Sequence, residues 1–243
     1  MAARVGAHTL ETRDLCVRYG GVTAVRDVSL RVGSGEVVGL IGPNGAGKTS
    51  LLNAVSGVAA PAGGTIALDG RSIGGASADR IARAGVVRTY QNVRLFRTLS
   101  VLDNIRAGAF AARRSLDPAR LKGVLERTAL VDVERAARAG NLPYGVQRRV
   151  EIARALASDP AMLLLDEPAA GLNPEESVRL GTLIRGIAGG GVGVLLVEHD
   201  MPLVRAVCDR VVVLNFGTVI ARGTPAEIGR DPAVIEAYLG SAR

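Results

Sequence analysis

Short apolar stretches recur along the chain, and each ends in glycine or in polar side chains. Those at residues 36–41, 162–166 and 192–197 have the length of strands and lack a regular alternation of polar positions. Strands that are apolar on both faces are typical of a parallel sheet with helices on either side. The pattern therefore predicts an α/β fold built on such a sheet.

Two further segments predict shorter strands. A short strand is expected from Gly85, with Gln91 at its end. Residues 64–73 are typical of an antiparallel hairpin, because an Asp69-Gly70 turn joins two halves that suit strands.

Helices are expected in the middle and at the end of the chain. Apolar positions from Val146 onward fall mostly at helical spacing, which makes residues 142–145 the loop at the start of a helix. Unpaired N–H groups at a helix start suit an anion, but this segment alone indicates only a turn. Residues from about 92 to 140 also suit helices. Thr224 to Glu227 has capping-box spacing, and Asp231-Pro232 is expected to start a last helix.

Composition limits the class of protein. The 243 residues, 48% of them hydrophobic, can bury the core of one large domain. No apolar stretch approaches the ~18 to 20 residues of a membrane helix, and the first residues lack the apolar region of a secretory signal. Cys16 and Cys208 are too few for a disulfide scaffold, so we expect a cytoplasmic protein with both thiols as small core residues.

The formal charge of +7 raises the question of nucleic acid. Arginine is spread along the chain, with short pairs only at Arg113/Arg114 and Arg148/Arg149, and aromatic residues are 3%. Stacking platforms for bases are therefore missing. We expect a basic, solvated surface and no nucleic-acid partner.

A glycine-rich segment supplies the clearest chemistry. Gly42, Gly47, Lys48 and Thr49 meet the pattern G-x-x-x-x-G-K-[ST] between a predicted strand and a predicted helix. Glycines let backbone N–H groups approach phosphate oxygens, lysine brings a positive charge to the β- and γ-phosphates, and the hydroxyl ligates Mg²⁺. The segment predicts a P-loop.

Polar side chains follow the other apolar strands. Carboxyl ends of parallel strands meet at one edge of the sheet, so Asp166 and Glu167 are expected to face the phosphates, the first as a Mg²⁺ ligand and the second to polarise the attacking water. Glu198 and His199 end the next strand before an Asp200 helix cap, and His199 is either a contact to the γ-phosphate or the water, or a structural residue. Gln91 can ligate Mg²⁺ or hold water.

Taken in order, "GPNGAGKT", Gln91, "LPYGVQRR", "MLLLDEP" and His199 resemble the Walker A, Q-loop, signature, Walker B and switch-histidine elements of the ATP-binding cassette (ABC) family. The resemblance extends from "LCVRYGGVTAVRDVSL" to "GTPAEIGRDPAVIEAYLG". Within the family, "VVRTYQNVRLF", "EPAAGLNP" and "VEHDM" are most similar to the ATPase subunits of branched-chain amino-acid importers, whose relatives move other small polar solutes.

This resemblance implies a P-loop NTPase fold of the α/β class, as a single ABC ATPase domain over residues 1–243. Residues of about 1–91 and 157–243 are expected to form a RecA-like core with a mixed sheet and an antiparallel β lobe. Residues of about 92–156 are expected to form an α-helical lobe that carries the signature.

The resemblance also implies ATP and Mg²⁺ as cofactors, and it assigns site residues. Nucleotide contacts are expected from Tyr19, Gly42, Pro43, Asn44, Gly45, Ala46, Gly47, Lys48, Thr49, Ser50, Leu142, Pro143, Tyr144, Gly145 and Val146; metal contacts from Thr49, Gln91 and Asp166; and catalytic roles for Glu167, His199 and Gln91. Tyr19 stands where the family stacks an aromatic ring on adenine, and a turn tyrosine is the alternative.

In this family two cassettes pair head to tail, and the signature loop of one touches the ATP of the other. The chain departs from the family's L-S-G-G-Q at Pro143, Tyr144 and Val146, while Leu142 and Gly145 remain. Proline has neither N–H nor hydroxyl, so two donors to phosphate are lost at that position.

The resemblance implies partners: a second cassette in a homo- or heterodimer, transmembrane permease subunits and an extracytoplasmic solute-binding protein. The chain would then lie on the inner face of the membrane, with Phe96 and Leu99 either in contact with the permease or packed inside the protein. The alternatives are a non-transport ABC ATPase that acts on nucleic acid or the ribosome, and an ATP-binding module with little turnover.

Overall fold

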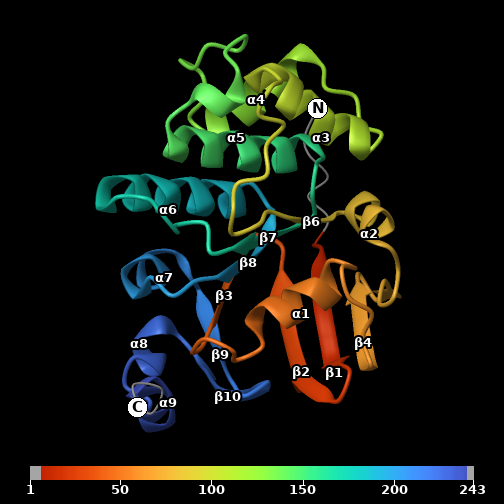
Figure 1. Cartoon of the computed structure of the whole chain (residues 1–243), viewed down its shortest axis with the longest axis vertical. Coiled ribbons are helices and arrows are strands. Elements are labelled where there is room, and N and C mark those ends of the chain that lie inside the picture. The colour runs from red at the N-terminus through yellow and green to blue at the C-terminus, as the bar shows by residue number, and fades with distance from the viewer. Residues whose placement is uncertain (1–6, 240–243) are drawn as a thin grey trace.

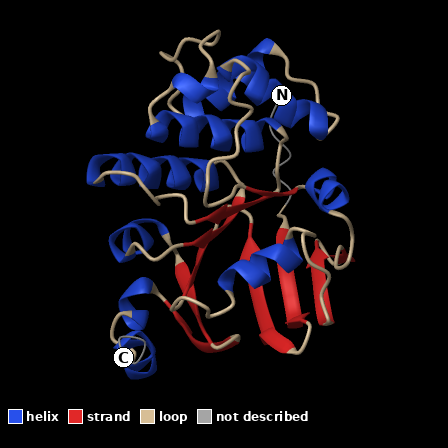
Figure 2. Cartoon of the chain, in the orientation of Figure 1, coloured by secondary structure: helices blue, strands red, loops and turns tan. Residues whose placement is uncertain are grey.

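The protein contains two β-sheets, with helices grouped against and between them (Figures 1 and 2). A computed structural model describes residues 7–239. Residues 1–6 and 240–243 lie outside the described residues. The expectation that the first residues form no secretory signal falls partly on this undescribed segment.

The larger sheet has six strands in the order β10-β9-β3-β8-β7-β6. Its strands are β3 (Val37–Ile41), β6 (Val86–Arg88), β7 (Met162–Asp166), β8 (Gly193–Val197), β9 (Arg210–Asn215) and β10 (Thr218–Gly223). All neighbours in it run parallel except β9 and β10, which are antiparallel. The predicted mixed-sheet α/β core is therefore confirmed.

The smaller sheet is antiparallel and has the order β2-β1-β4-β5. Its strands are β1 (Thr9–Tyr19), β2 (Val22–Gly33), β4 (Gly63–Leu68) and β5 (Arg71–Ser72). The hairpin of β4 and β5 turns at Asp69, whose φ of 53° is left-handed, and Gly70. This confirms the predicted hairpin and the antiparallel lobe.

The helices are α1 (Lys48–Val55), α2 (Ala78–Ala84), α3 (Val101–Ala111), α4 (Pro118–Arg127), α5 (Tyr144–Ala157), α6 (Pro174–Gly189), α7 (Met201–Val207), α8 (Pro225–Ile228) and α9 (Pro232–Leu239), with a 3-10 turn at Ala139–Asn141. Helices α3, α4 and α5 form a layer at the top of Figure 1, beyond α6 and the large sheet. One apolar cluster joins this layer, α6 and α7 to one face of the large sheet. A second cluster packs α1 between the two sheets.

Several expectations about helix ends need correction. Helix α5 begins at Tyr144 rather than Val146, because the carbonyl of Pro143 already accepts the N–H groups of Val146 and Gln147. Between 92 and 140 the chain is only partly helical, and left-handed residues follow two of its helices, Arg113 at φ 54° and Ala129 at φ 51°. By contrast, the capping box at Thr224 and the cap at Asp200 are confirmed.

Two expectations about side chains also need correction. Cys208 is buried as expected, but Cys16 is only half-buried, and its thiol donates to Asp27 Oδ1 at 3.1 Å. Arg148 does not belong to the basic, solvated surface, since its side chain is 1% exposed.

Two glycines inside the helical layer allow a matched test of its packing. A Cβ on Gly108 in α3 would lie 1.9 Å from the carbonyl oxygen of Arg154 in α5, whereas a Cβ on Gly123 in α4 would meet nothing within 4 Å. We expect Gly108→Ala to lower the free energy of unfolding by about 1–3 kcal/mol through overpacking. Gly123→Ala should raise it by roughly 0.5–1 kcal/mol, because alanine favours helix. Urea denaturation measures both, and equal effects would contradict the close contact of α3 and α5.

Candidate nucleotide-binding and hydrolysis site

The P-loop joins the buried strand β3 to helix α1. Gly47 caps α1 with a left-handed φ of 102°, and a Cβ there would lie 2.4 Å from the carbonyl oxygen of Ala24. Only glycine fits this backbone and this contact. The helix therefore starts at Lys48, as the sequence predicts, with its N-terminal N–H groups at the loop.

Lys48 lies inside the loop that its motif assigns to phosphate. Its Nζ donates to the carbonyl oxygens of Gly42 at 2.7 Å and Pro43 at 2.9 Å. Burial lowers the pKa of the Lys48 ammonium, and the nearby carboxylates of Glu167 and Asp166 oppose that shift. The structure thus brings the P-loop lysine and the acidic pair together.

The acidic pair stands at the end of β7. Asp166 is the last residue of that strand, and Glu167 follows with a left-handed φ of 45°. This conformation costs a non-glycine residue of order 1–3 kcal/mol and is concentrated at functional sites. The N–H of Glu167 donates to the carbonyl of Val197 in β8 at 2.9 Å, which holds the turn.

Glu167 is surrounded by the other predicted catalytic residues. Gln91 Nε2 donates to Glu167 Oε2 at 2.8 Å, and His199 Nδ1 lies 3.7 Å from the same oxygen. The His199 side chain is 63% exposed, so it is not a packed core histidine. Three residues far apart in sequence therefore meet at one carboxylate.

Asp166 has a partner that the sequence analysis missed. Arg88, the last residue of β6, donates to Asp166 Oδ2 at 2.7 Å, and both side chains are nearly buried. The same guanidinium also donates to Asn53 Oδ1 at 2.7 Å and Ser56 Oγ at 3.2 Å on α1. The position of Arg88 at the end of a predicted strand was the one feature of the sequence that could have indicated this contact. Arg88 fixes one oxygen of the predicted metal ligand.

Glu198 was expected at the end of a strand, but the sequence analysis gave it no role. It is fully buried, and its carboxylate accepts the N–H groups of Ala169, His199 and Asp200. Burial raises the pKa of Glu198, while these N–H groups and His199 oppose the shift. The contacts tie the loop after Glu167 to the loop that carries His199.

The signature segment leads into α5, which belongs to the helical layer (Figure 1). Tyr144 is 40% exposed, and a Cβ on Gly145 would lie 2.4 Å from Glu176 Oε1 at the start of α6. The same Glu176 closes the capping box of α6 with Asn173. A larger residue at Gly145 would therefore displace the Glu176 carboxylate from this capping box.

Tyr19, at the end of β1, is 46% exposed. Its hydroxyl accepts from Asn53 Nδ2 at 3.5 Å. An exposed ring beside α1 agrees with a stacking role, which stays a prediction.

Comparison with known proteins identifies the family. The model of the ABC transporter family matches residues 25–170. The chain belongs to this family of ATP-hydrolysing cassettes. A second model, described as branched-chain amino acid ATP-binding cassette transporter, matches residues 218–243.

Relatives of this ABC cassette match it over nearly its whole length. The high-affinity branched-chain amino acid transport ATP-binding protein LivG of Salmonella typhimurium is 47% identical, over 96% of this chain and 98% of that protein. The corresponding BraF of Pseudomonas aeruginosa is 45% identical, with the same shares covered. Among solved structures, the ADP conformation of MJ1267, an ATP-binding cassette of an ABC transporter, matches with a TM-score of 0.87 at 27% identity, over 96% of this chain and 99% of that one.

The cassette's donor set suits Mg²⁺. Thr49, Gln91 and Asp166 offer a hydroxyl, an amide and a carboxylate, all of which are hard oxygen donors. Within residues 7–239, no group of three or more His, Cys, Asp or Glu side chains could hold a metal by itself. Mg²⁺ is typically bound by one or two protein ligands together with water and substrate phosphates, so the residues fit this ion.

Two lysines allow a matched test of the P-loop of this cassette. Lys48→Ala should weaken binding of ATP about 10-fold or more, because a charged hydrogen bond contributes about 1.5–3 kcal/mol. Lys122→Ala is the control, since Lys122 on α4 is 77% exposed and pairs only loosely with Glu126 at 3.8 Å. Equilibrium binding of a fluorescent ATP analogue measures both variants. An unchanged affinity in Lys48→Ala would contradict the assignment.

Proposed function

We propose that this cassette is the ATPase subunit of an importer of branched-chain amino acids or similar small polar solutes. The observation that carries the proposal is the cluster of Gln91, Glu167 and His199 beside the P-loop, in a chain 45–47% identical to two transport ATP-binding proteins. We further propose that residues of about 92–156 act as one helical lobe on a core formed by the rest.

The proposed reaction uses this chain's residues in defined roles. Lys48 and the P-loop N–H groups bind the β- and γ-phosphates, and Tyr19 stacks on adenine. Glu167 accepts a proton from the attacking water, which Gln91 orients through its bond to that carboxylate, and His199 contacts the γ-phosphate or the water. Mg²⁺, held by Thr49, Gln91 and Asp166, would supply neutralising charge at the phosphates.

The proposed transporter needs partners. Within residues 7–239, no helix is both long and apolar enough to span a membrane. We propose that separate transmembrane permease subunits form the permeation path and hold this cassette on the inner face of the cell membrane. An extracytoplasmic solute-binding protein delivers the solute, and ATP is hydrolysed in a dimer with a second cassette.

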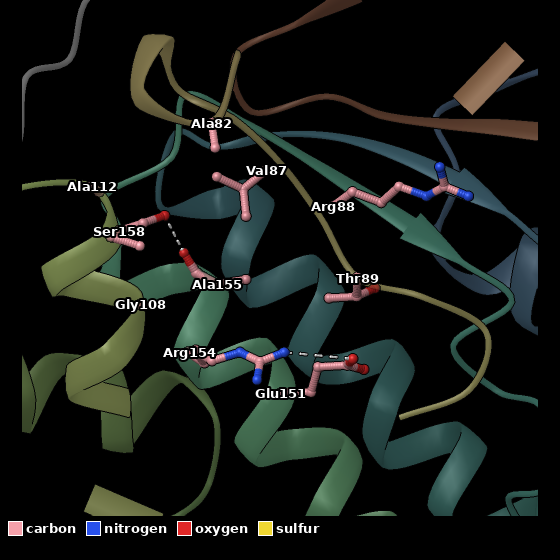
Figure 3. Close-up of a pocket in the computed structure, with 11 residues that line it drawn as sticks. Ala82, Val87, Arg88, Thr89, Gly108, Ala112, Glu151, Arg154, Ala155 and Ser158 are labelled. Atoms are coloured by element: carbon pink, nitrogen blue, oxygen red, sulfur yellow. Dashed lines mark hydrogen bonds and ion pairs between the residues drawn. The ribbon is translucent and has the colours of Figure 1, made fainter. Parts of the chain in front are cut away.

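The helical layer offers a surface for the permease. Phe96 and Leu99 are 52% and 40% exposed, which contradicts their packing inside the protein. A pocket of about 120 Å³ opens between the β6 segment and helices α3 and α5, with Val87, Gly108 and Ala155 on its walls (Figure 3). Arg154, which lines this pocket, has its guanidinium 5.7 Å from the centre of the Phe96 ring. An exposed aromatic residue near a pocket suits a helix of a membrane partner.

The function is tested by reconstitution. The cassette is assembled with candidate permeases and a solute-binding protein in vesicles, and ATP hydrolysis is measured with leucine and with a matched acidic amino acid. Stimulation by leucine alone supports the proposal. A rate of ATP hydrolysis that changes neither with the permeases nor with the amino acid would contradict the proposal.

A first prediction concerns the proposed base. Glu167→Gln should slow ATP hydrolysis by about 10² to 10⁴, the usual contribution of a positioned acid–base group. Binding of ATP should stay nearly intact, because the amide retains the shape of the side chain. Glu175→Gln, at an exposed position in the first turn of α6, is the control. If Glu167→Gln kept more than half of the parent rate, Glu167 would not be the base.

A second candidate function, an ATP-binding module with little turnover, is favoured by the signature loop. Pro143 and Val146 lack the hydroxyl and the amide that the family's pattern carries there. The start of α5 still offers N–H groups, because the first intrahelical bond that the Pro143 carbonyl accepts comes from Val146. The two candidates thus differ in whether these N–H groups suffice.

A second prediction decides between them. Loss of one preorganised donor to developing charge costs about 2.7–4 kcal/mol in enzymes that depend on it. We therefore expect the isolated protein to be a poor ATPase, and Pro143→Ser with Val146→Gln to raise its rate at least several-fold, at saturating Mg-ATP. Equal rates of two folded proteins would show that the N–H groups of α5 bind the phosphate well enough.

A further inference from the structure

Arg148 is a buried arginine that bonds two successive carbonyls of one loop. It lies on α5, and its side chain is 1% exposed. Its Nη1 donates to the carbonyl of Tyr90 at 2.7 Å, and its Nη2 to the carbonyl of Gln91 at 2.5 Å. A guanidinium that bonds two successive carbonyls fixes the backbone between them, because its donors form a planar, rigid fork.

Glu151, one turn further along α5, completes the arrangement. Its Oε2 accepts from Arg148 Nη1 at 2.9 Å, and its Oε1 accepts the N–H of Arg94 at 2.9 Å. The Glu151 side chain is 1% exposed, so each buried charge depends on the other. Figure 3 shows Glu151 beside Arg154 on α5, with Thr89 opposite. The pair therefore holds the chain on both sides of Gln91.

A short series of contacts connects this pair to the reacting atoms. Gln91 Nε2 donates to Glu167 Oε2 at 2.8 Å, while the carbonyl of Gln91 is held by Arg148. Arg148 Nη2 also lies 3.2 Å from the hydroxyl of Tyr144 in the signature segment. One guanidinium thus touches both the backbone of Gln91 and the first turn of the signature helix.

We propose that Arg148 is a positioning residue for hydrolysis, which fixes the Gln91 loop on the signature helix so that the Gln91 amide meets Glu167. It acts through Gln91 and does not itself touch ATP. The inference rests on the proposed roles of Gln91 and Glu167, and it adds a residue to which neither the P-loop nor the signature pattern assigns a function.

The test separates positioning from fold stability by comparing Arg148→Met with Arg149→Met. Arg149 is the next residue of α5, but its guanidinium donates to the carbonyl of Ala129 in the helical layer. We expect Arg148→Met to lower kcat about 10-fold or more, since small misplacements of a positioned group have effects of up to about 10². The affinity for ATP should change less than about 2-fold, because Lys48 and the P-loop remain. Arg149→Met should keep the parent kcat.

Two further measurements identify the route of the effect. Hydrogen exchange of a peptide that covers residues 89–95 should become faster in Arg148→Met and not in Arg149→Met. In a Gln91→Ala background, Arg148→Met should lower kcat less than about 2-fold, because residues that act as a unit are not additive. If Arg148→Met fails to fold, Arg148→Lys retains the charge but lacks the planar fork that reaches the two carbonyls from separate nitrogens, and it should show the same effects in smaller measure.

Each outcome supports or overturns the inference. A parent kcat in Arg148→Met, or a lower kcat with unchanged exchange at 89–95, overturns it, and so does an equal loss with and without Gln91. A different result would contradict the proposed function itself: a Glu167→Gln variant that hydrolyses ATP at the parent rate. An active Arg148→Met beside an inactive Glu167→Gln would reject the positioning role alone.

Discussion

The parallel register of β3, β8, β7 and β6 is the constraint on which the rest of the site depends. Leu40 and Asp166 both pair with Val197, so the P-loop, the acidic pair and the His199 loop leave the sheet at the same level. Arg88, on the outer strand β6, pairs with Leu164 of β7. This pairing brings the Gln91 loop to the same edge of the sheet. Because all these strands run the same way, their carboxyl ends collect the reactive groups in one place.

Several charged side chains near the ends of these strands are buried, and each is held by a hydrogen-bonding partner. Arg88 pairs with Asp166, Arg148 with Glu151, and Glu198 accepts three backbone N–H groups. Buried pairs of this kind contribute little net stability, because desolvation offsets much of their attraction. Their common effect is positional, since each fixes a loop that carries a predicted catalytic residue. The left-handed Glu167 fits the same account, because local strain is tolerated where the surroundings determine the geometry.

The sequence predicted the parts of the fold that depend on local patterns. Unbroken apolar stretches gave the parallel strands, and glycine and capping residues gave the P-loop and the helix starts at Lys48 and Pro225. Gln91, Glu167 and His199 could be named because each follows a strand end. Arg88, Arg148 and Glu198 could not be given roles, because a charged residue in sequence looks solvated until its partner, up to 78 residues away, is known. The helices between 92 and 140 could not be delimited from the sequence either, because tertiary contacts and left-handed turns determine where they end.

The signature loop shows which of its positions geometry restricts and which it leaves free. A Cβ on Gly145 would displace the Glu176 carboxylate, and the carbonyl of Leu142 accepts Gln147 Nε2 at 2.7 Å, so both positions take part in the start of α5. Pro143 occupies the N-cap, where only its carbonyl is needed, and the helix forms without its N–H. Two of the departures also make contacts, since the Tyr144 hydroxyl accepts from Arg148 at 3.2 Å and Val146 packs against an apolar cluster. At Pro143 the fold needs no side-chain donor, so only a bound phosphate would distinguish serine from proline there.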